Sequence, residues 1–248
     1  MIIGGLEKLT LIDYPGEMAA IVFTTGCNFR CHFCYNPMLV LPVNGDKLGN
    51  TSSNNNEEER DHSQISEDDL FIFLKSRQGK IEAVVVTGGE PTLHQDLPEF
   101  LARIKTMGFK VKLDTNGTNP AMLQRVLDAG LVDYLAMDLK ATADKYTHVV
   151  GVPVDMDSVK KSIQLIKNSG LPYEFRTTVV PGLHEVGDIE AMGELIAGAQ
   201  KWYLQFFKSN TGLIDKNLEG RHAHTPADMK EMRERALKYV DFCELRGD

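Results

Sequence analysis

Short apolar runs alternate with helix-like periods along most of this 248-residue sequence. Runs of four to eight β-branched and apolar residues are typical of strands that are buried on both faces. Because each intervening helix returns the chain to the same edge of a sheet, the repetition predicts parallel pairing. The predicted strands are Ala19–Thr24, Ala83–Thr87, Lys110–Asp114, Tyr134–Asp138, Tyr173–Val180 and Trp202–Phe207.

Helix signals stand between these runs. Asn119 and Pro120 suit the N-cap and first turn of one helix, and Thr225–Pro226 opens a last helix, predicted over about residues 226–245. The length suits an eight-unit barrel, but only six strand–helix units are visible. We therefore predict an α/β fold, a partial (β/α)6 TIM-like barrel, rather than a doubly wound sheet. In either fold the functional site belongs at the carboxyl ends of the strands.

One stretch departs from the composition of the rest. Residues 51–69 hold seven acidic residues, one arginine and a single aliphatic residue, Ile65. Such a segment buries too little apolar surface to offset its ordering entropy, so residues 45–64 are predicted to be a mobile polar insertion in a single domain spanning 1–248. Much of the net charge of −8 is local to this stretch. The acidic balance argues against a nucleic-acid partner.

The sequence lacks recognisable targeting segments, and its cysteines are clustered, which together indicate the cytoplasm. No run approaches the roughly 18 apolar residues of a membrane span, and Met1–Thr10 lacks a basic flank and an apolar signal core. Clustered cysteines without a secretory signal more often bind metal than form disulfides. The sequence predicts a cytoplasmic protein without a membrane partner and excludes a secreted disulfide scaffold.

Three of the four cysteines are clustered. Cys27, Cys31 and Cys34 form C-x3-C-x2-C just beyond the first predicted strand. A loop with this spacing can curl three thiolates around one face of an iron–sulfur cube, which usually takes four cysteines, so one iron is left open to another ligand. A zinc site with three thiolates, or three unrelated thiols, are the alternatives. Cys243, near the end of the last predicted helix, is interpreted as an incidental thiol.

The segment CNFRCHFC resembles the cluster-binding motif of the radical S-adenosylmethionine (SAM) superfamily, in which an aromatic residue, here Phe33, precedes the third cysteine. The resemblance implies that Cys27, Cys31 and Cys34 bind a 4Fe–4S cluster. It also implies that the amino and carboxylate groups of SAM chelate the open iron.

A second signature follows the second predicted strand. Thr87–Pro91 reads TGGEP, where the family places a Gly-Gly-Glu that receives the SAM ammonium. Gly88 and Gly89 would let backbone carbonyls approach closely, and Glu90 would supply the complementary charge. Taken alone, GGEP is also compatible with a turn before a helix.

Polar residues end three further predicted strands. Asp114–Gly117 reads DTNG, Asp138–Lys140 reads DLK, and Glu174 and Arg176 point to one face of the fifth strand. Polar side chains inside a barrel are costly unless they are paired or face a ligand. Asn116-Gly117 as an ordinary turn, and Glu174–Arg176 as a buried ion pair, are the alternatives.

These segments resemble the glycyl-radical enzyme activase branch of the superfamily. The resemblance implies that Lys140 and Arg176 meet the carboxylate or ribose of SAM. It implies that Asp114, Thr115 and Asp138 form a polar patch that could bind a monovalent cation.

The N-terminal GGLEKLTLIDYPG resembles the longer type of anaerobic ribonucleoside-triphosphate reductase activating protein. The resemblance implies one-electron cleavage of SAM and abstraction of a hydrogen atom from a glycine of that partner, a glycyl-radical enzyme. Cluster potentials reach about −700 mV, far below a cytosolic thiol poise of roughly −250 mV, so a flavodoxin- or ferredoxin-like electron donor is expected. Because only one cysteine lies outside the motif, a single cluster is expected.

Two other functions remain open at this point. One is a radical SAM enzyme acting on a small molecule, as 7-carboxy-7-deazaguanine synthase does. The other is a non-enzymatic metal or redox protein.

Overall fold

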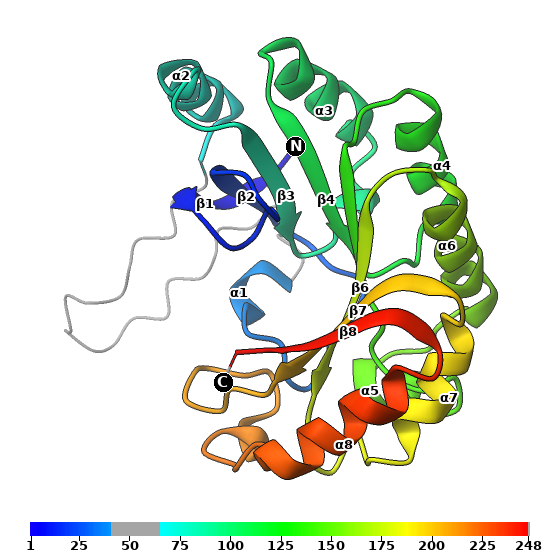
Figure 1. Cartoon of the computed structure of the whole chain (residues 1–248). Coiled ribbons are helices and arrows are strands. Elements are labelled where there is room, and N and C mark those ends of the chain that lie inside the picture. The colour runs from blue at the N-terminus through cyan, green and yellow to red at the C-terminus, as the bar shows by residue number, and fades with distance from the viewer. Residues whose placement is uncertain (41–64, 248) are drawn as a thin grey trace, which may run out of the picture.

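Eight strands form one curved sheet whose spatial order, β1 to β8, follows the chain (Figure 1). The structure is a computed structural model, and it describes residues 1–40 and 65–247. β1 (Ile3–Thr10) is antiparallel to β2 (Ala19–Thr24), and every later pairing is parallel. Within the described ranges the sheet does not close, because β1 and β8 form its opposite edges. The predicted insertion at 45–64 lies outside the described residues.

The helices of eight or more residues follow one another around the outside of the sheet, whereas the short α1 lies nearer its centre (Figure 1). The remaining strands are β3 (Ala83–Gly88), β4 (Lys110–Thr115), β5 (Tyr134–Asp138), β6 (Tyr173–Val179), β7 (Ala199–Phe206) and β8 (Val240–Arg246). The α-helices are α1 (Pro37–Val40), α2 (Glu67–Arg77), α3 (Leu97–Thr106), α4 (Pro120–Asp128), α5 (Tyr146–Val150), α6 (Met156–Asn168), α7 (Asp188–Leu195) and α8 (Pro226–Ala236). Two 3-10 turns, η1 (Pro91–Leu93) and η2 (Lys216–Leu218), complete the elements.

The predicted partial barrel is confirmed, and all six predicted strands are present within a few residues. Local signals explain several boundaries. The Asn119 side chain accepts a hydrogen bond from the Met122 N–H, with Pro120 in the first turn of α4. Thr225 and Asp228 form a reciprocal capping box at the start of α8.

The predicted helix over 226–245 is wrong in its second half. α8 ends at Ala236, and Val240–Arg246 is β8, a seventh parallel strand that pairs with β7. Met229, Met232, Val240 and Cys243 are spaced as on one helix face, so periodicity alone did not reveal the change. Pairing along β7 satisfies backbone groups that would otherwise form an exposed edge, and this long-range gain overrides the local pattern. β1, which the sequence reading also omitted, covers the other edge.

Residues between β1 and β2 plug the inside of the barrel. Tyr14 is 5% exposed and packs its ring against that of Tyr134, 5.7 Å away between centroids. The Asp13 carbonyl accepts a 2.6 Å hydrogen bond from the ammonium of Lys112, which is 2% exposed. Ala19 and Ala83, at the starts of β2 and β3, belong to the same small apolar cluster. The plug therefore lies at the amino ends of the strands, opposite the end where a barrel site is expected.

None of the helices in the described ranges combines the length and apolarity that a membrane crossing needs.

Tyr14→Ala is expected to lower the free energy of unfolding by about 3 kcal/mol, because it leaves a cavity under the barrel. Ile12→Ala, at a neighbouring side chain that is 85% exposed, is the matched control and is expected to cost less than about 0.5 kcal/mol. Denaturant unfolding under anoxia, followed by circular dichroism, measures both. Equal effects of the two variants would show that the segment does not plug the barrel.

Candidate functional site

A cavity of about 360 Å³ opens at the carboxyl ends of the strands. All twelve residues proposed from the sequence line it, although they come from five separate chain segments. They are Cys27, Cys31, Phe33, Cys34, Gly88, Gly89, Glu90, Asp114, Thr115, Asp138, Lys140 and Arg176. The folding of the chain thus brings the predicted residues to one place, while the role of each remains a prediction.

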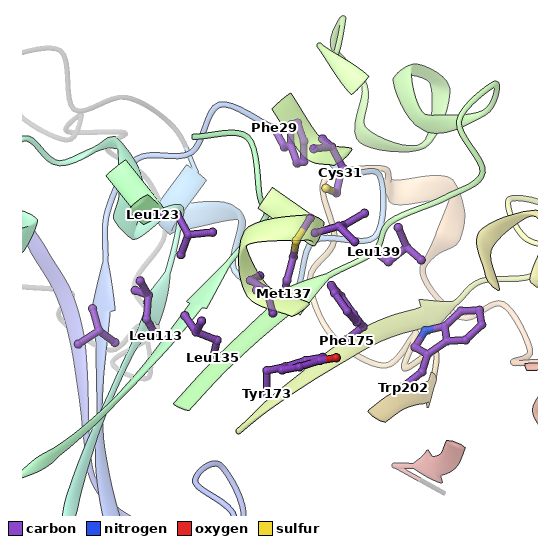
Figure 2. Packing of buried hydrophobic residues seen from close by; sticks show 14 of the residues in the cluster. Phe29, Cys31, Leu113, Leu123, Leu135, Met137, Leu139, Tyr173, Phe175 and Trp202 are labelled. Carbon is purple, nitrogen blue, oxygen red and sulfur yellow. The ribbon is translucent and has the colours of Figure 1, made fainter. Parts of the chain in front are cut away.

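The cysteine loop follows β2 and is held by backbone contacts rather than by regular structure. The Arg30 N–H donates to the Val150 carbonyl at 2.8 Å, which fixes the loop to the end of α5. The Arg30 guanidinium donates to the carbonyls of Cys27 and Phe29, each at 2.7 Å. Figure 2 shows Phe29 and Cys31 among the buried apolar side chains of the core. The loop is therefore rigidly seated between the core and the cavity.

Burial keeps two of the three thiols of the loop protonated in the absence of metal. Burial raises the pKa of Cys27 to about 12 and that of Cys31 to about 11, so the metal-free thiols are protonated at neutral pH and only a bound metal makes them thiolates. A zinc site needs its thiolates about 2.3 Å from a single ion. A 4Fe–4S cube instead offers a different iron to each cysteine.

The two glycines of TGGEP allow two chain segments to meet. A Cβ at Gly88, whose φ is +117°, would lie 2.3 Å from the Thr24 backbone nitrogen, and one at Gly89 would lie 2.0 Å from the Gly26 carbonyl oxygen. The Gly89 N–H donates to the Thr24 carbonyl at 2.8 Å, and the Glu90 N–H donates to the Gly26 carbonyl at 2.8 Å. The sequence reading explained these glycines by approach to a ligand. The structure gives an additional cause, which is the close contact between this segment and the start of the cysteine loop.

Glu90 joins TGGEP to DTNG. Glu90 is 1% exposed. Its Oε1 atom accepts hydrogen bonds from the Thr115 hydroxyl, at 2.7 Å, and from both the N–H and the hydroxyl of Thr92. Its Oε2 atom accepts one hydrogen bond, from the Asn116 N–H at 2.6 Å. Burial raises the pKa of Glu90, and these donors oppose the rise. Three of the four bonds fall on Oε1, so Oε2 is the atom with acceptor capacity left for a ligand.

Asn116 is a lining residue that the sequence reading did not select. Its side-chain amide donates to Asn28 Oδ1 at 2.9 Å and lies 4.0 Å from the sulfur of Cys27. Its position directly after a predicted strand could have marked it as a site residue, but the Asn116-Gly117 pair was equally compatible with an ordinary turn. Gln205 of β7 also lines the cavity.

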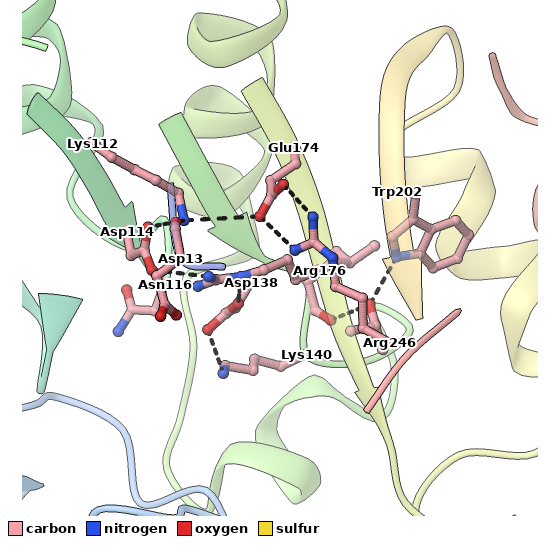
Figure 3. Close-up of polar contacts among 12 residues, drawn as sticks. Asp13, Lys112, Asp114, Asn116, Asp138, Lys140, Glu174, Arg176, Trp202 and Arg246 are labelled. Carbon is pink, nitrogen blue, oxygen red and sulfur yellow. Dashed lines mark hydrogen bonds and ion pairs between the residues drawn. The ribbon is translucent and has the colours of Figure 1, made fainter. Parts of the chain in front are cut away.

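A chain of charges crosses the floor of the cavity (Figure 3). Arg176 donates to Asp138 Oδ1 through Nε and to Asp114 Oδ2 through Nη1, each at 2.9 Å. Lys140 donates to Asp138 Oδ2 at 2.9 Å. Burial alone would raise the pKa of Asp138, but the charges of Arg176 and Lys140 hold it well below its ordinary value.

Glu174 pairs with a partner that the sequence did not suggest. Arg246 of β8 donates to Glu174 Oε1 at 3.0 Å and to Oε2 at 2.9 Å, and Tyr134 donates to Oε2 at 3.2 Å. The alternative of a direct Glu174–Arg176 pair is therefore wrong. Glu174 belongs to the packed interior of the barrel, whereas Arg176 lines the cavity.

Comparison with known proteins identifies relatives of this chain, one of which covers nearly all of it. The family described as the Radical SAM superfamily matches residues 21–196. A putative glycyl-radical enzyme activating enzyme of Methanocaldococcus jannaschii is 31% identical over 250 residues, covering 99% of this chain and 95% of its own. A 7-carboxy-7-deazaguanine synthase of Halobacterium salinarum is 33% identical over 103 residues, 42% of this chain and 33% of its own. The structure of a domain of pyruvate-formate lyase-activating enzyme from Bacteroides vulgatus shares the fold, with a TM-score of 0.54, 18% identity, and 67% and 99% of the two chains covered.

Gly89→Ala is expected to cost about 1–3 kcal/mol of unfolding free energy and to lower the iron bound per chain, because its Cβ collides with the backbone before the cysteine loop. Gly187→Ala is the control, since a Cβ there meets nothing within 4 Å. Denaturant unfolding and iron analysis of anaerobically reconstituted protein measure the two effects. Full iron content in a stable Gly89→Ala protein would contradict the proposed contact.

Proposed function

The chain belongs to the radical SAM superfamily, and we propose that it is an activase that abstracts a hydrogen atom from a glycine of a partner enzyme. The observation that carries this proposal is the end-to-end similarity to the M. jannaschii activating enzyme, which covers 99% of one chain and 95% of the other. As a radical SAM enzyme, the protein uses a 4Fe–4S cluster and SAM as its cofactors.

We assign the cluster to Cys27, Cys31 and Cys34. These are the only cysteines at the cavity, and the fourth, Cys243, is buried in β8. Three thiolates leave one iron of the cube without a protein ligand, where SAM would bind. When bound, the reduced cluster supplies the electron that cleaves the S–C5′ bond of SAM.

The other lining residues would position SAM. Gly88, Gly89 and Glu90 would receive its ammonium, with Glu90 Oε2 as the available acceptor. Lys140 and Arg176 would meet its carboxylate or ribose. Lys140 Nζ lies 5.8 Å from the centroid of the Phe33 ring, so the loop aromatic helps to fix the ammonium next to the cysteines.

The size of the cavity supports a protein substrate. A volume of about 360 Å³ lies near the lower end of the roughly 300–1,000 Å³ of small-ligand sites, and here it must accommodate SAM. A glycine-bearing loop of a partner would enter from the open rim instead. The partner we favour is anaerobic ribonucleoside-triphosphate reductase, on the resemblance carried by the N-terminal LIDYPG. A flavodoxin- or ferredoxin-like donor in an anoxic cytoplasm would reduce the cluster.

A second candidate is a reaction on a small molecule. It is favoured by the 33% identity to a 7-carboxy-7-deazaguanine synthase. That similarity extends over 42% of the chain, so we rank it below the activase.

Cys31→Ala is expected to abolish SAM cleavage and to lower cluster content, whereas Cys243→Ala is expected to retain about four irons and four sulfides per chain. The two variants are matched because both replace a buried thiol. Iron and sulfide analysis after anaerobic reconstitution tests them. If Cys243→Ala emptied the site, the ligand assignment would be wrong.

The activase proposal predicts a glycyl radical on the partner. Reduced protein, SAM and the candidate reductase are mixed under strict anoxia, and an electron paramagnetic resonance spectrum is recorded. A glycyl doublet that requires SAM and is absent with Cys31→Ala is expected. Cleavage of SAM without a radical on any co-encoded glycyl-radical enzyme would favour the small-molecule reaction.

A further inference from the structure

Two carboxylates at neighbouring strand ends share one guanidinium. Asp138 ends β5, Asp114 lies near the end of β4, and Arg176 is the register partner of Asp138 on β6. The guanidinium is therefore held between the two acids by the pairing of three strands. It uses two different nitrogens, Nε for Asp138 and Nη1 for Asp114, each at 2.9 Å (Figure 3).

Every oxygen of the two carboxylates faces a side-chain cation. Asp114 Oδ2 and Asp138 Oδ1 face Arg176. Asp138 Oδ2 lies 2.9 Å from Lys140 Nζ, and Asp114 Oδ1 lies 3.2 Å from Lys112 Nζ. Asp114 Oδ1 accepts no hydrogen bond, so its contact with Lys112 is one of charge alone. A metal ion between the acids would compete with Arg176, Lys140 and Lys112 for the same four oxygens.

Thr115, the third member of the predicted cation patch, has its hydroxyl committed elsewhere. It donates to Glu90 Oε1 at 2.7 Å and accepts from the Gly117 N–H at 3.1 Å. The three residues that the resemblance suggested for a monovalent cation thus do not fit one.

The local charge also opposes an added ion. Lys112, Lys140 and Arg176 already balance the three acids Asp114, Asp138 and Glu90, the last of which is buried and accepts from Thr115. The nearby pair of Glu174 and Arg246 leaves this balance unchanged. A further cation would raise the buried positive charge before the sulfonium of SAM arrives, and uncompensated buried charge is costly.

We infer that Arg176 takes the place of a monovalent metal ion, so that this enzyme binds SAM without one. The guanidinium neutralises the two acids and leaves the site ready for SAM. Removing it would leave two carboxylates facing a space that a sodium or potassium ion can fill. The inference rests on the SAM site alone and not on the glycine step.

The test measures SAM affinity by anaerobic calorimetry on reconstituted enzyme, in choline, sodium or potassium chloride at about 0.15 M. The wild-type enzyme is expected to bind SAM equally in the three salts, within about twofold. Arg176→Gln is expected to bind SAM at least about tenfold more weakly in choline, and sodium or potassium is expected to restore most of that loss.

Two further variants isolate the cause. Arg176→Lys retains the charge and is expected to remain indifferent to the salt. Arg176→Gln combined with Asp114→Asn removes one carboxylate and is expected to lose the restoration by sodium or potassium. Thermal unfolding in each salt reports whether the variants are folded and whether the ion itself binds, independently of SAM.

Two results would overturn the inference. One is a wild-type affinity that rises more than about threefold in sodium or potassium over choline, which remains measurable even if Arg176→Gln does not fold. The other is a folded Arg176→Gln protein that is equally weak in all three salts. Because no partner protein is present, neither result depends on whether the enzyme activates a glycine.

Discussion

The buried ion pairs along β4, β5 and β6 are the interaction on which the site depends. Arg176 can lie inside β6, level with the end of β5, only because Asp114 and Asp138 meet its charge there. One layer deeper, Lys112 approaches Asp114, and its ammonium also donates to the carbonyl of Asp13. Losing one member would leave an unpaired charge in the barrel, which typically costs about 3–5 kcal/mol. The charges therefore fix the relative positions of neighbouring strand ends.

Because the sheet is open, other parts of the chain must pair with its outer strands and fill the amino-terminal end of the barrel. The segment after β1 fills the floor with Tyr14, and β8 pairs along β7. Arg246, the last residue of β8, donates to Glu174 on β6 and lies over the ring of Tyr203. The segment after β1 and the strand β8 thus support the same buried charges from opposite edges of the sheet.

The sequence predicted what depends on local pattern. The six alternating strands follow from apolar runs and caps, and the twelve candidate residues, all of which line the cavity, follow from short motifs that resemble those of a known family. It did not predict β8, because the spacing of Met229 to Cys243 suits a helix equally well and only pairing with β7 decides. It did not predict the partner of Glu174 either, because Arg246 lies 72 residues away along the chain. Such choices are made by long-range contacts, which a pattern read along the chain does not contain.

The three motifs of the site form a closed ring of contacts. The cysteine loop meets TGGEP where Gly26 accepts from Glu90, and TGGEP meets DTNG where Glu90 accepts from Asn116. Asn116 closes the ring, since its side-chain amide donates to Asn28 beside Cys27. Because each link is a buried or half-buried polar contact, a shift in one motif is transmitted to the other two. These contacts explain how short motifs far apart in the sequence build one site: each motif is hydrogen-bonded to the other two.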